Sequence, residues 1–87
     1  MIIRFHGIFE KQIKKLASSN RIKLKEKLGI FIADEFNPIL NNHPLKGKYK
    51  GYRSINIAGD LRAVYKRDPN NNCAIFIAIG SHNKLYR

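Results

Sequence analysis

The sequence is poor in several residue types, and each shortage excludes a class of protein. It contains one cysteine, Cys73, and no tryptophan. A single thiol cannot form a disulfide within the chain, so the fold does not depend on oxidising conditions. Apolar runs are short: none approaches the ~18–20 residues of a membrane span, and the apolar stretch at the N-terminus is too short for a signal peptide. We therefore expect a cytoplasmic protein with no membrane role.

Acidic residues are scarce relative to basic ones. Six Asp and Glu face 17 Lys and Arg, which gives a formal net charge of +11 in 87 residues. Such an excess repels itself in the compact state and calls for a partner of opposite charge. A polyanion is the natural candidate, because each neutralised phosphate releases counterions. The charge therefore predicts an RNA-binding surface, and the plainer alternative is a surface that serves only solubility.

The length allows a single domain, residues 1–87, with a thin hydrophobic core. Weak alternation predicts a short strand over 2–6, and apolar residues at helical spacing predict a helix over 8–17. Residues 18–20 read as a helix break and as the N-cap of a second, longer helix. That helix must end near Pro38, because the residue before a proline disfavours the helical conformation.

The second half of the chain predicts strands instead of helices. Residues 41–51 read as a loop, and turn signals then separate three expected strands, over 52–57, 61–67 and 73–79. The last of these has apolar residues on both faces, as a central strand does. The resulting β-α-α-β-β-β order predicts an α+β domain, with a helical hairpin packed on one face of a small, largely antiparallel sheet.

Two histidines in this half, His43 and His82, stand near turn signals. Imidazole titrates near neutrality, so the two could share general base and general acid work. That work would suffice to cut RNA without a metal ion. A base takes the proton of a ribose 2′-hydroxyl, the oxygen attacks the adjacent phosphorus, and an acid protonates the leaving 5′-oxygen. Which histidine would be base and which acid stays open.

Other polar residues of the same half complete a candidate site. A guanidinium grips two phosphate oxygens at once, so Arg53 and Arg62 are candidates for holding the phosphate. Asp60 could orient a histidine or assist as a base, and tyrosines could stack on RNA bases or donate a proton: Tyr52, Tyr65 and Tyr86. Three loop lysines would bind phosphate without sequence preference: Lys46, Lys48 and Lys50. The plainer interpretation of each is a solvated loop, turn or core residue.

Other chemistries are not favoured. The three histidines lack the close spacing of a zinc site, and no cysteine accompanies them. No GxxxxGK[ST] phosphate loop is present. Cys73 lies in an apolar strand, which favours an inert thiol over a nucleophile. We expect neither a metal ion nor a small-molecule cofactor.

Four short motifs in a fixed order give a resemblance to a known family. They are His43-Pro44-Leu45-Lys46-Gly47, Lys50-Gly51-Tyr52-Arg53, the run from Gly59-Asp60 to Tyr65, and the run from Gly80-Ser81-His82 to Tyr86. The chain resembles toxins of the RelE/ParE superfamily, and most closely the YafQ branch. The resemblance implies a RelE-like fold and the toxin of a type II toxin–antitoxin system, an endonuclease that cuts messenger RNA in a ribosome-dependent way.

The resemblance also implies roles for particular residues. In YafQ-like toxins the loop histidine, the strand aspartate, the closing histidine and the aromatic after it belong to the active site; they correspond here to His43, Asp60, His82 and Tyr86. In RelE-like relatives, basic residues at the positions of Arg53 and Arg62 serve the phosphate. The YafQ pattern has histidine, tryptophan and arginine where this chain has Asn56, Leu61 and Ala78.

Partners and products follow from the same resemblance. It implies a cognate acidic antitoxin, messenger RNA, and the ribosome with its 16S rRNA, and products that end in 2′,3′-cyclic phosphate and 5′-hydroxyl groups. Two alternatives stay open. A ParE-like inhibitor of DNA gyrase cuts no RNA and needs neither His43 nor His82. A non-catalytic RNA- or ribosome-binding domain would use the charge and neither histidine.

Overall fold

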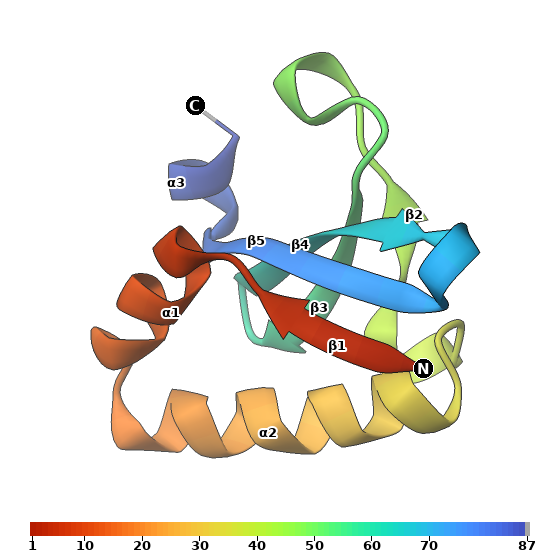
Figure 1. Cartoon of the computed structure of the whole chain (residues 1–87). Helices are drawn as coiled ribbons and strands as arrows, with labels where there is room; N and C mark the ends of the chain where they lie inside the picture. Colours follow the sequence, from red (N-terminus) through yellow and green to blue (C-terminus); the bar gives the residue numbers. More distant parts are fainter. Residues whose placement is uncertain (87) are drawn as a thin grey trace.

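The protein folds as a five-stranded sheet with two helices on one face and a short third helix on the other (Figure 1). The computed structural model describes residues 1–86. In chain order its elements are β1 (Ile2–Phe5), α1 (Gly7–Lys14), α2 (Ser18–Ala33), β2 (His43–Pro44), β3 (Arg53–Ala58), β4 (Leu61–Asp68), β5 (Cys73–Ser81) and α3 (His82–Leu85). Short 3-10 turns lie at Pro38–Leu40, Gly47–Tyr49 and Pro69–Asn71.

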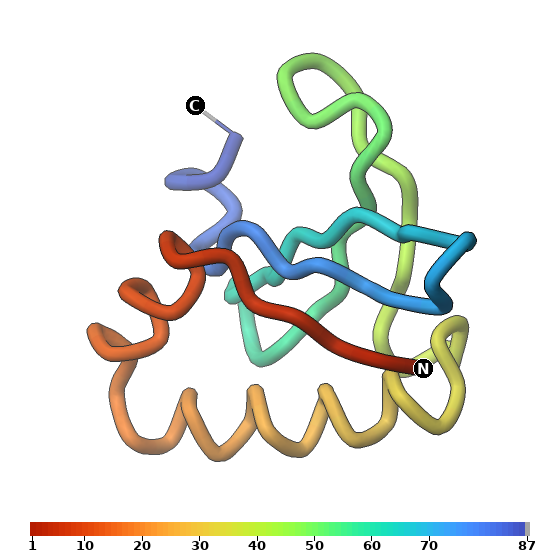
Figure 2. Tube along the Cα trace, viewed as in Figure 1, coloured from red at the N-terminus to blue at the C-terminus, as the bar shows by residue number. Residues whose placement is uncertain are grey.

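The strand order across the sheet is β1-β5-β4-β3-β2. β1 pairs with β5 in parallel, and the other three pairings are antiparallel. The first strand of the chain therefore lies beside the last, as the trace in Figure 2 shows. β5 lies between β1 and β4, in agreement with its two apolar faces. The predicted α+β class and the helical hairpin on one face of a largely antiparallel sheet are confirmed.

The helix ends differ from the predicted ones. His6 caps α1, because its Nδ1 accepts a hydrogen bond from the Ile8 amide at 3.2 Å, and the helix ends at Lys14. α2 begins at Ser18, and its N-cap, Ala17, makes no side-chain hydrogen bond. The expectation of an N-cap within residues 18–20 was therefore wrong. Those residues lie inside the first turn, where the Ser18 hydroxyl accepts from the Arg21 guanidinium at 3.4 Å.

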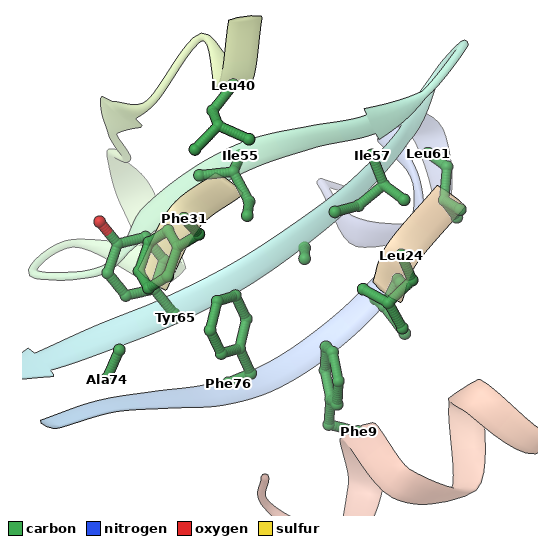
Figure 3. Close-up of a cluster of buried hydrophobic side chains, with 12 residues drawn as sticks. Phe9, Leu24, Phe31, Leu40, Ile55, Ile57, Leu61, Tyr65, Ala74 and Phe76 are labelled. Atoms are coloured by element: carbon green, nitrogen blue, oxygen red, sulfur yellow. The ribbon is translucent and has the colours of Figure 1, made fainter. Parts of the chain in front are cut away.

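Aromatic rings form the centre of the core between the helices and the sheet (Figure 3). The Phe76 ring centroid lies 5.6 Å from that of Phe9, 5.3 Å from that of Phe31 and 5.2 Å from that of Tyr65. All four side chains are fully buried. Burial of such large apolar surfaces is the main favourable term for a domain of this size. This packing holds β4 and β5 against both helices. It thereby also fixes the positions of the strand residues that point to the opposite face of the sheet.

Candidate active site

The side of the sheet opposite α1 and α2, which we call the open face, carries most of the candidate residues. Strand register decides which ones, because directly paired residues point to the same face. His43 pairs with Ser54, Ser54 with Val64, and Val64 with Ala78, so these four form one row across β2, β3, β4 and β5. Val64 and Ala78 belong to a cluster separate from the main core. His43 therefore belongs to the open face.

Arg62 lies in the next row of the same face, paired with Asn56 on one side and Gly80 on the other. Its guanidinium Nη1 donates to the carbonyl of Gly59 at 2.7 Å and to that of Leu61 at 3.3 Å. The side chain is folded back onto the turn between β3 and β4, which leaves its other nitrogen atoms available to an anion.

His82 and Tyr86 reach the open face through α3. Ser81 caps this short helix, since its hydroxyl accepts from the Lys84 amide at 3.3 Å. The His82 amide donates to the carbonyl of Asp60 at 3.0 Å, which ties the start of α3 to the turn that carries Asp60. The His82 and Tyr86 rings lie 4.7 Å apart, edge to face. Asp60, Arg62, His82 and Tyr86 are thus brought to one end of the sheet.

The centre of the open face is apolar. Val64, Ala78 and Leu85 are buried there, and apolar or aromatic side chains pack around them: Leu45, Tyr49, Tyr52, Ile77 and Tyr86. Figure 1 shows α3 and the loop between β2 and β3 rising on this side, away from α2. The centre of the open face is therefore an apolar patch, and cations lie at its margin.

Loop lysines and tyrosines form part of that margin. Lys46, Lys48 and Lys50 are exposed. The Lys48 ammonium lies 5.2 Å from the centroid of the Tyr49 ring, and that ring lies 6.0 Å from the ring of Tyr86. A hollow of about 310 Å³ is lined by Lys46, Gly47, Lys48, Tyr49 and Tyr86. The loop therefore brings ammonium groups and aromatic rings together beside Tyr86.

The His43 ring is held by its own loop. Its Nδ1 lies 2.8 Å from the backbone oxygen of Asn41. A carbonyl oxygen only accepts hydrogen bonds, so Nδ1 must carry the proton, and the lone pair of the neutral ring is on Nε2. Such a ring presents a proton acceptor on the side away from Asn41.

Arg53 does not lie beside Arg62, as a shared role in holding the phosphate would require. It pairs with Tyr65, whose side chain is buried on the helix side, so it points away from the face of His43 and Arg62. Its guanidinium carbon lies 5.2 Å from the centroid of the Phe36 ring, and its Nε donates to Asn42 Oδ1 at 2.7 Å. Arg62 pairs with Asn56, which is three residues from Arg53 on β3 and therefore on the opposite face. The two guanidiniums are thus on different sides of the sheet.

At the three positions that differ from the YafQ pattern, the side chain is wholly or partly buried. Leu61 is part of the main core, and Ala78 is buried in the cluster of the open face. Asn56 pairs with Arg62, and its Oδ1 is buried without a hydrogen-bond partner among residues 1–86. Two of these positions carry hydrocarbon side chains with no acid–base chemistry, so any such work falls to the remaining polar groups.

Sequence reasoning missed a polar network behind the site. Asn42 Nδ2 donates to the Tyr65 hydroxyl at 2.7 Å, and that hydroxyl donates to Glu35 Oε2 at 2.7 Å. Glu35 Oε1 also accepts from Arg67 Nε at 3.1 Å. Neither Glu35 nor Asn42 lies in a recognisable motif. The one signal available was that Asn42 directly precedes His43.

Tyr65 gives this network a measurable pH dependence. Burial raises the pKa of its phenol above the ordinary value, and the hydrogen bond to Glu35 raises it further, while the bond from Asn42 opposes the shift. The native state then keeps a proton that the unfolded chain loses above about pH 10. The free energy of unfolding should therefore fall as pH rises, by about 1.4 kcal/mol at about pH 11.

The measurement is urea denaturation at about pH 9 and about pH 11, compared between the wild type and Tyr65→Phe. The variant lacks the ionisable hydroxyl, so the other titrating groups cancel in the comparison. An equal loss of stability in both proteins at the higher pH would contradict a raised phenol pKa.

A groove of about 770 Å³ lies beside the end of β5, between α1 and α3. Open-face residues line part of it (Tyr49, Tyr52, Ala78 and Leu85), but His43, Arg62 and His82 do not. Gln12 lines this groove, and its side-chain oxygen accepts a hydrogen bond from the Ile79 amide at 2.8 Å. Within residues 1–86, no three His, Cys, Asp or Glu side chains are grouped to hold a metal ion, and no helix is long and apolar enough to cross a membrane.

Comparison with known proteins identifies the family. The model of a family described as "Bacterial toxin of type II toxin-antitoxin system, YafQ" matches residues 1–87. YafQ from E. coli is 27% identical over 98% of this chain and 97% of that chain, with a TM-score of 0.79. No curated protein gives a significant match.

Two further solved structures are similar over nearly their whole lengths. A chain of the E. coli DinJ-YafQ complex is 26% identical, over 98% of this chain and 97% of that chain, with a TM-score of 0.75. A metal-bound toxin from Helicobacter pylori is 28% identical over 99% of both chains, also with a TM-score of 0.75. The family match over the full length, together with these structural likenesses, leads to one conclusion: the chain belongs to the YafQ family of bacterial toxins of type II toxin–antitoxin systems.

Proposed function

We propose that this YafQ-family toxin is a ribosome-dependent endoribonuclease that cuts messenger RNA by attack of a ribose 2′-hydroxyl. One observation carries the proposal. His43, Arg62 and the His82–Tyr86 segment come from three separate parts of the chain, and all lie on the open face or at its end. A base, a phosphate-binding cation and an acid are what this reaction requires.

The hydrogen bond at Nδ1 favours His43 as the base. Its Nε2 lone pair is available to take the 2′-hydroxyl proton, because the Nδ1 proton is engaged with the Asn41 carbonyl. Arg62 then stabilises the charge that gathers on the phosphate oxygens. His82, as imidazolium, protonates the leaving 5′-oxygen, with Tyr86 against its ring and Asp60 at its backbone.

The spacing of the strands supports a role for the ribosome. β2 and β5 are separated by three inter-strand steps, which is roughly 14 Å at the backbone. The two histidines would therefore approach one phosphate from opposite sides of an RNA chain, and neither of them lines the groove of about 770 Å³ or the hollow of about 310 Å³. An RNA held in place by the ribosome would present its phosphate between them, and such positioning contributes much of the rate in bimolecular reactions. The loop cations Lys46, Lys48 and Lys50 would hold neighbouring phosphates.

An acidic antitoxin is the second proposed partner. The related YafQ has been solved in complex with DinJ, and the net charge of +11 favours an acidic segment that folds over this surface. A neighbouring gene for a small acidic protein, and coexpression that restores growth, would support the pairing.

The proposed chemistry is tested with a single-atom change in the RNA. Ribosomes are programmed with a messenger that carries one 2′-deoxyribose immediately 5′ of a mapped cut, and the products are read by primer extension. The cut at that position should vanish, because the attacking oxygen is missing, while cuts elsewhere in the same RNA persist. Fragments from the unmodified RNA should end in 2′,3′-cyclic phosphate. Undiminished cutting at the deoxy position would refute attack by the 2′-hydroxyl.

A further inference from the structure

We infer that Asn42, held by Arg53 and Tyr65, is a positioning residue that fixes the imidazole of His43 for proton transfer. The inference rests on the proposed function, in which His43 is the base. Asn42, Arg53 and Tyr65 act from the helix side of the sheet, so they do not themselves face the RNA.

Asn42 uses both ends of its side-chain amide. Its Nδ2 donates to the Tyr65 hydroxyl at 2.7 Å and to the backbone carbonyl of Glu35 at 3.0 Å. Its Oδ1 accepts from Arg53 Nε at 2.7 Å. Three hydrogen bonds to partners on different elements leave this side chain no other position of comparable energy. The residue immediately before His43 is therefore fixed.

Its partners are themselves held. Arg53 and Tyr65 are directly paired on β3 and β4, so their spacing is set by the sheet. The Arg53 guanidinium lies over the Phe36 ring, and the Tyr65 ring packs at 4.8 Å against Phe31 of α2. Glu35, which accepts from Tyr65, is also paired with Arg67. The anchor of Asn42 thus extends into the two strands and into α2.

His43 depends on this anchor because its own strand is very short. β2 comprises only His43 and Pro44, so two register pairs hold it to β3. Asn41, which accepts from His43 Nδ1, has a left-handed backbone with φ of 46°. Asparagine adopts this conformation more readily than most residues other than glycine, and here it ends the Pro38–Leu40 turn, with the Asn41 amide bonded to the Pro38 carbonyl at 3.1 Å. Release of Asn42 would free the Asn41 carbonyl, and the His43 ring would lose the bond that sets its tautomer.

The test combines the variant Asn42→Ala with ¹⁵N NMR of the histidine rings, which reports which ring nitrogen carries the proton. In the wild type, His43 should show one tautomer with the proton on Nδ1. In Asn42→Ala its two nitrogen signals should move toward averaged values, while those of His6 and His82 stay unchanged. The single-turnover rate of RNA cleavage on the ribosome should fall by about 10²-fold, with little change in the concentration for half-saturation.

A matched control separates positioning from general loosening of the fold. Gln12→Ala removes one side-chain hydrogen bond of 2.8 Å at the far edge of the sheet, so it should lower thermal stability without moving the His43 signals. If Asn42→Ala does not fold, two milder variants replace it. Tyr65→Phe removes the hydrogen bond between Asn42 and the phenol, and Arg53→Lys removes the one from Arg53 Nε. The His43 signals of these variants then test whether the anchor sets the tautomer.

Two results would overturn the inference: unchanged His43 signals in a folded anchor variant, or an equal change in Gln12→Ala. The proposed function fails separately. If His43→Ala cuts RNA at the wild-type rate, His43 is not the base, whatever the spectra of the anchor variants show.

Discussion

Replacement of His82 or His43 by alanine should slow RNA cleavage by about 10²–10⁴-fold, because each variant removes one of the two proposed proton-transfer groups. The direct measurement is the single-turnover rate on programmed ribosomes, and growth arrest on induction should be lost in parallel. His82 is exposed and His43 half-buried, so both variants should stay folded. The double variant should be scarcely slower than the worse single one if the two groups act as a unit.

The third histidine provides the control. His6 caps α1 through its Nδ1 and belongs to neither β2 nor α3. Asparagine is also a favourable N-cap, so His6→Asn keeps the helix start while it removes an imidazole. This variant should cut RNA at the wild-type rate. If both alanine variants remained fully toxic, the two histidines would not be the acid and base, and a gyrase inhibitor or a plain binding domain would describe the toxin better.

Local patterns predicted most of the fold because each element has its own period. Turn signals delimit β3 and β4, and the two apolar faces of β5 are visible along most of its length, so these strands were located to within two residues. β2 escaped detection, since two residues cannot show a period of two. The extension of β5 to Ser81 was also missed, because the Gly80-Ser81 pair reads as a bend.

Pairing between distant segments was beyond local reasoning. β1 and β5 lie at opposite ends of the chain, and neither sequence carries a mark of its partner. The polar network around the Tyr65 hydroxyl likewise joins residues that are far apart in the sequence. Glu35, Asn42 and Arg67 come from three connections or strand ends, and only the folded chain brings them to the Tyr65 hydroxyl or its partner. No spacing rule in one dimension predicts such a cluster.

Motif reasoning found the candidate site residues but not the side of the sheet on which each lies. Arg53 and Arg62 were given the same role, although cross-strand pairing puts Arg53 with Tyr65 and Arg62 with Asn56. Strand parity decides the face, and parity in turn depends on register, which a one-residue slip reverses. The consequence is chemical. Of these two guanidiniums, Arg62 alone is on the face of His43, so the proposed phosphate contact falls to it.

Arg62→Ala should therefore lower the cleavage rate by about 10²–10³-fold, the usual cost of losing a donor to the charge of a transition state. Arg62→Lys should recover part of the rate, because an ammonium keeps the charge but cannot grip two oxygens at once. Arg21→Ala is the matched control: this exposed arginine lies on α2, beneath the other face of the sheet, and its loss changes the net charge by the same amount.

A separate measurement of ribosome binding and of the rate at saturating ribosome distinguishes two roles for Arg62. Both alanine variants remove one positive charge, so a purely electrostatic role would weaken ribosome binding equally and leave the bound rate constant unchanged. A contact made in the transition state predicts that Arg62→Ala lowers the rate at saturating ribosome while Arg21→Ala does not. Equal rates in the two variants at saturation would leave Arg62 as one cation among many on a basic surface, and the phosphate contact would have to come from the loop that carries Lys46, Lys48 and Lys50.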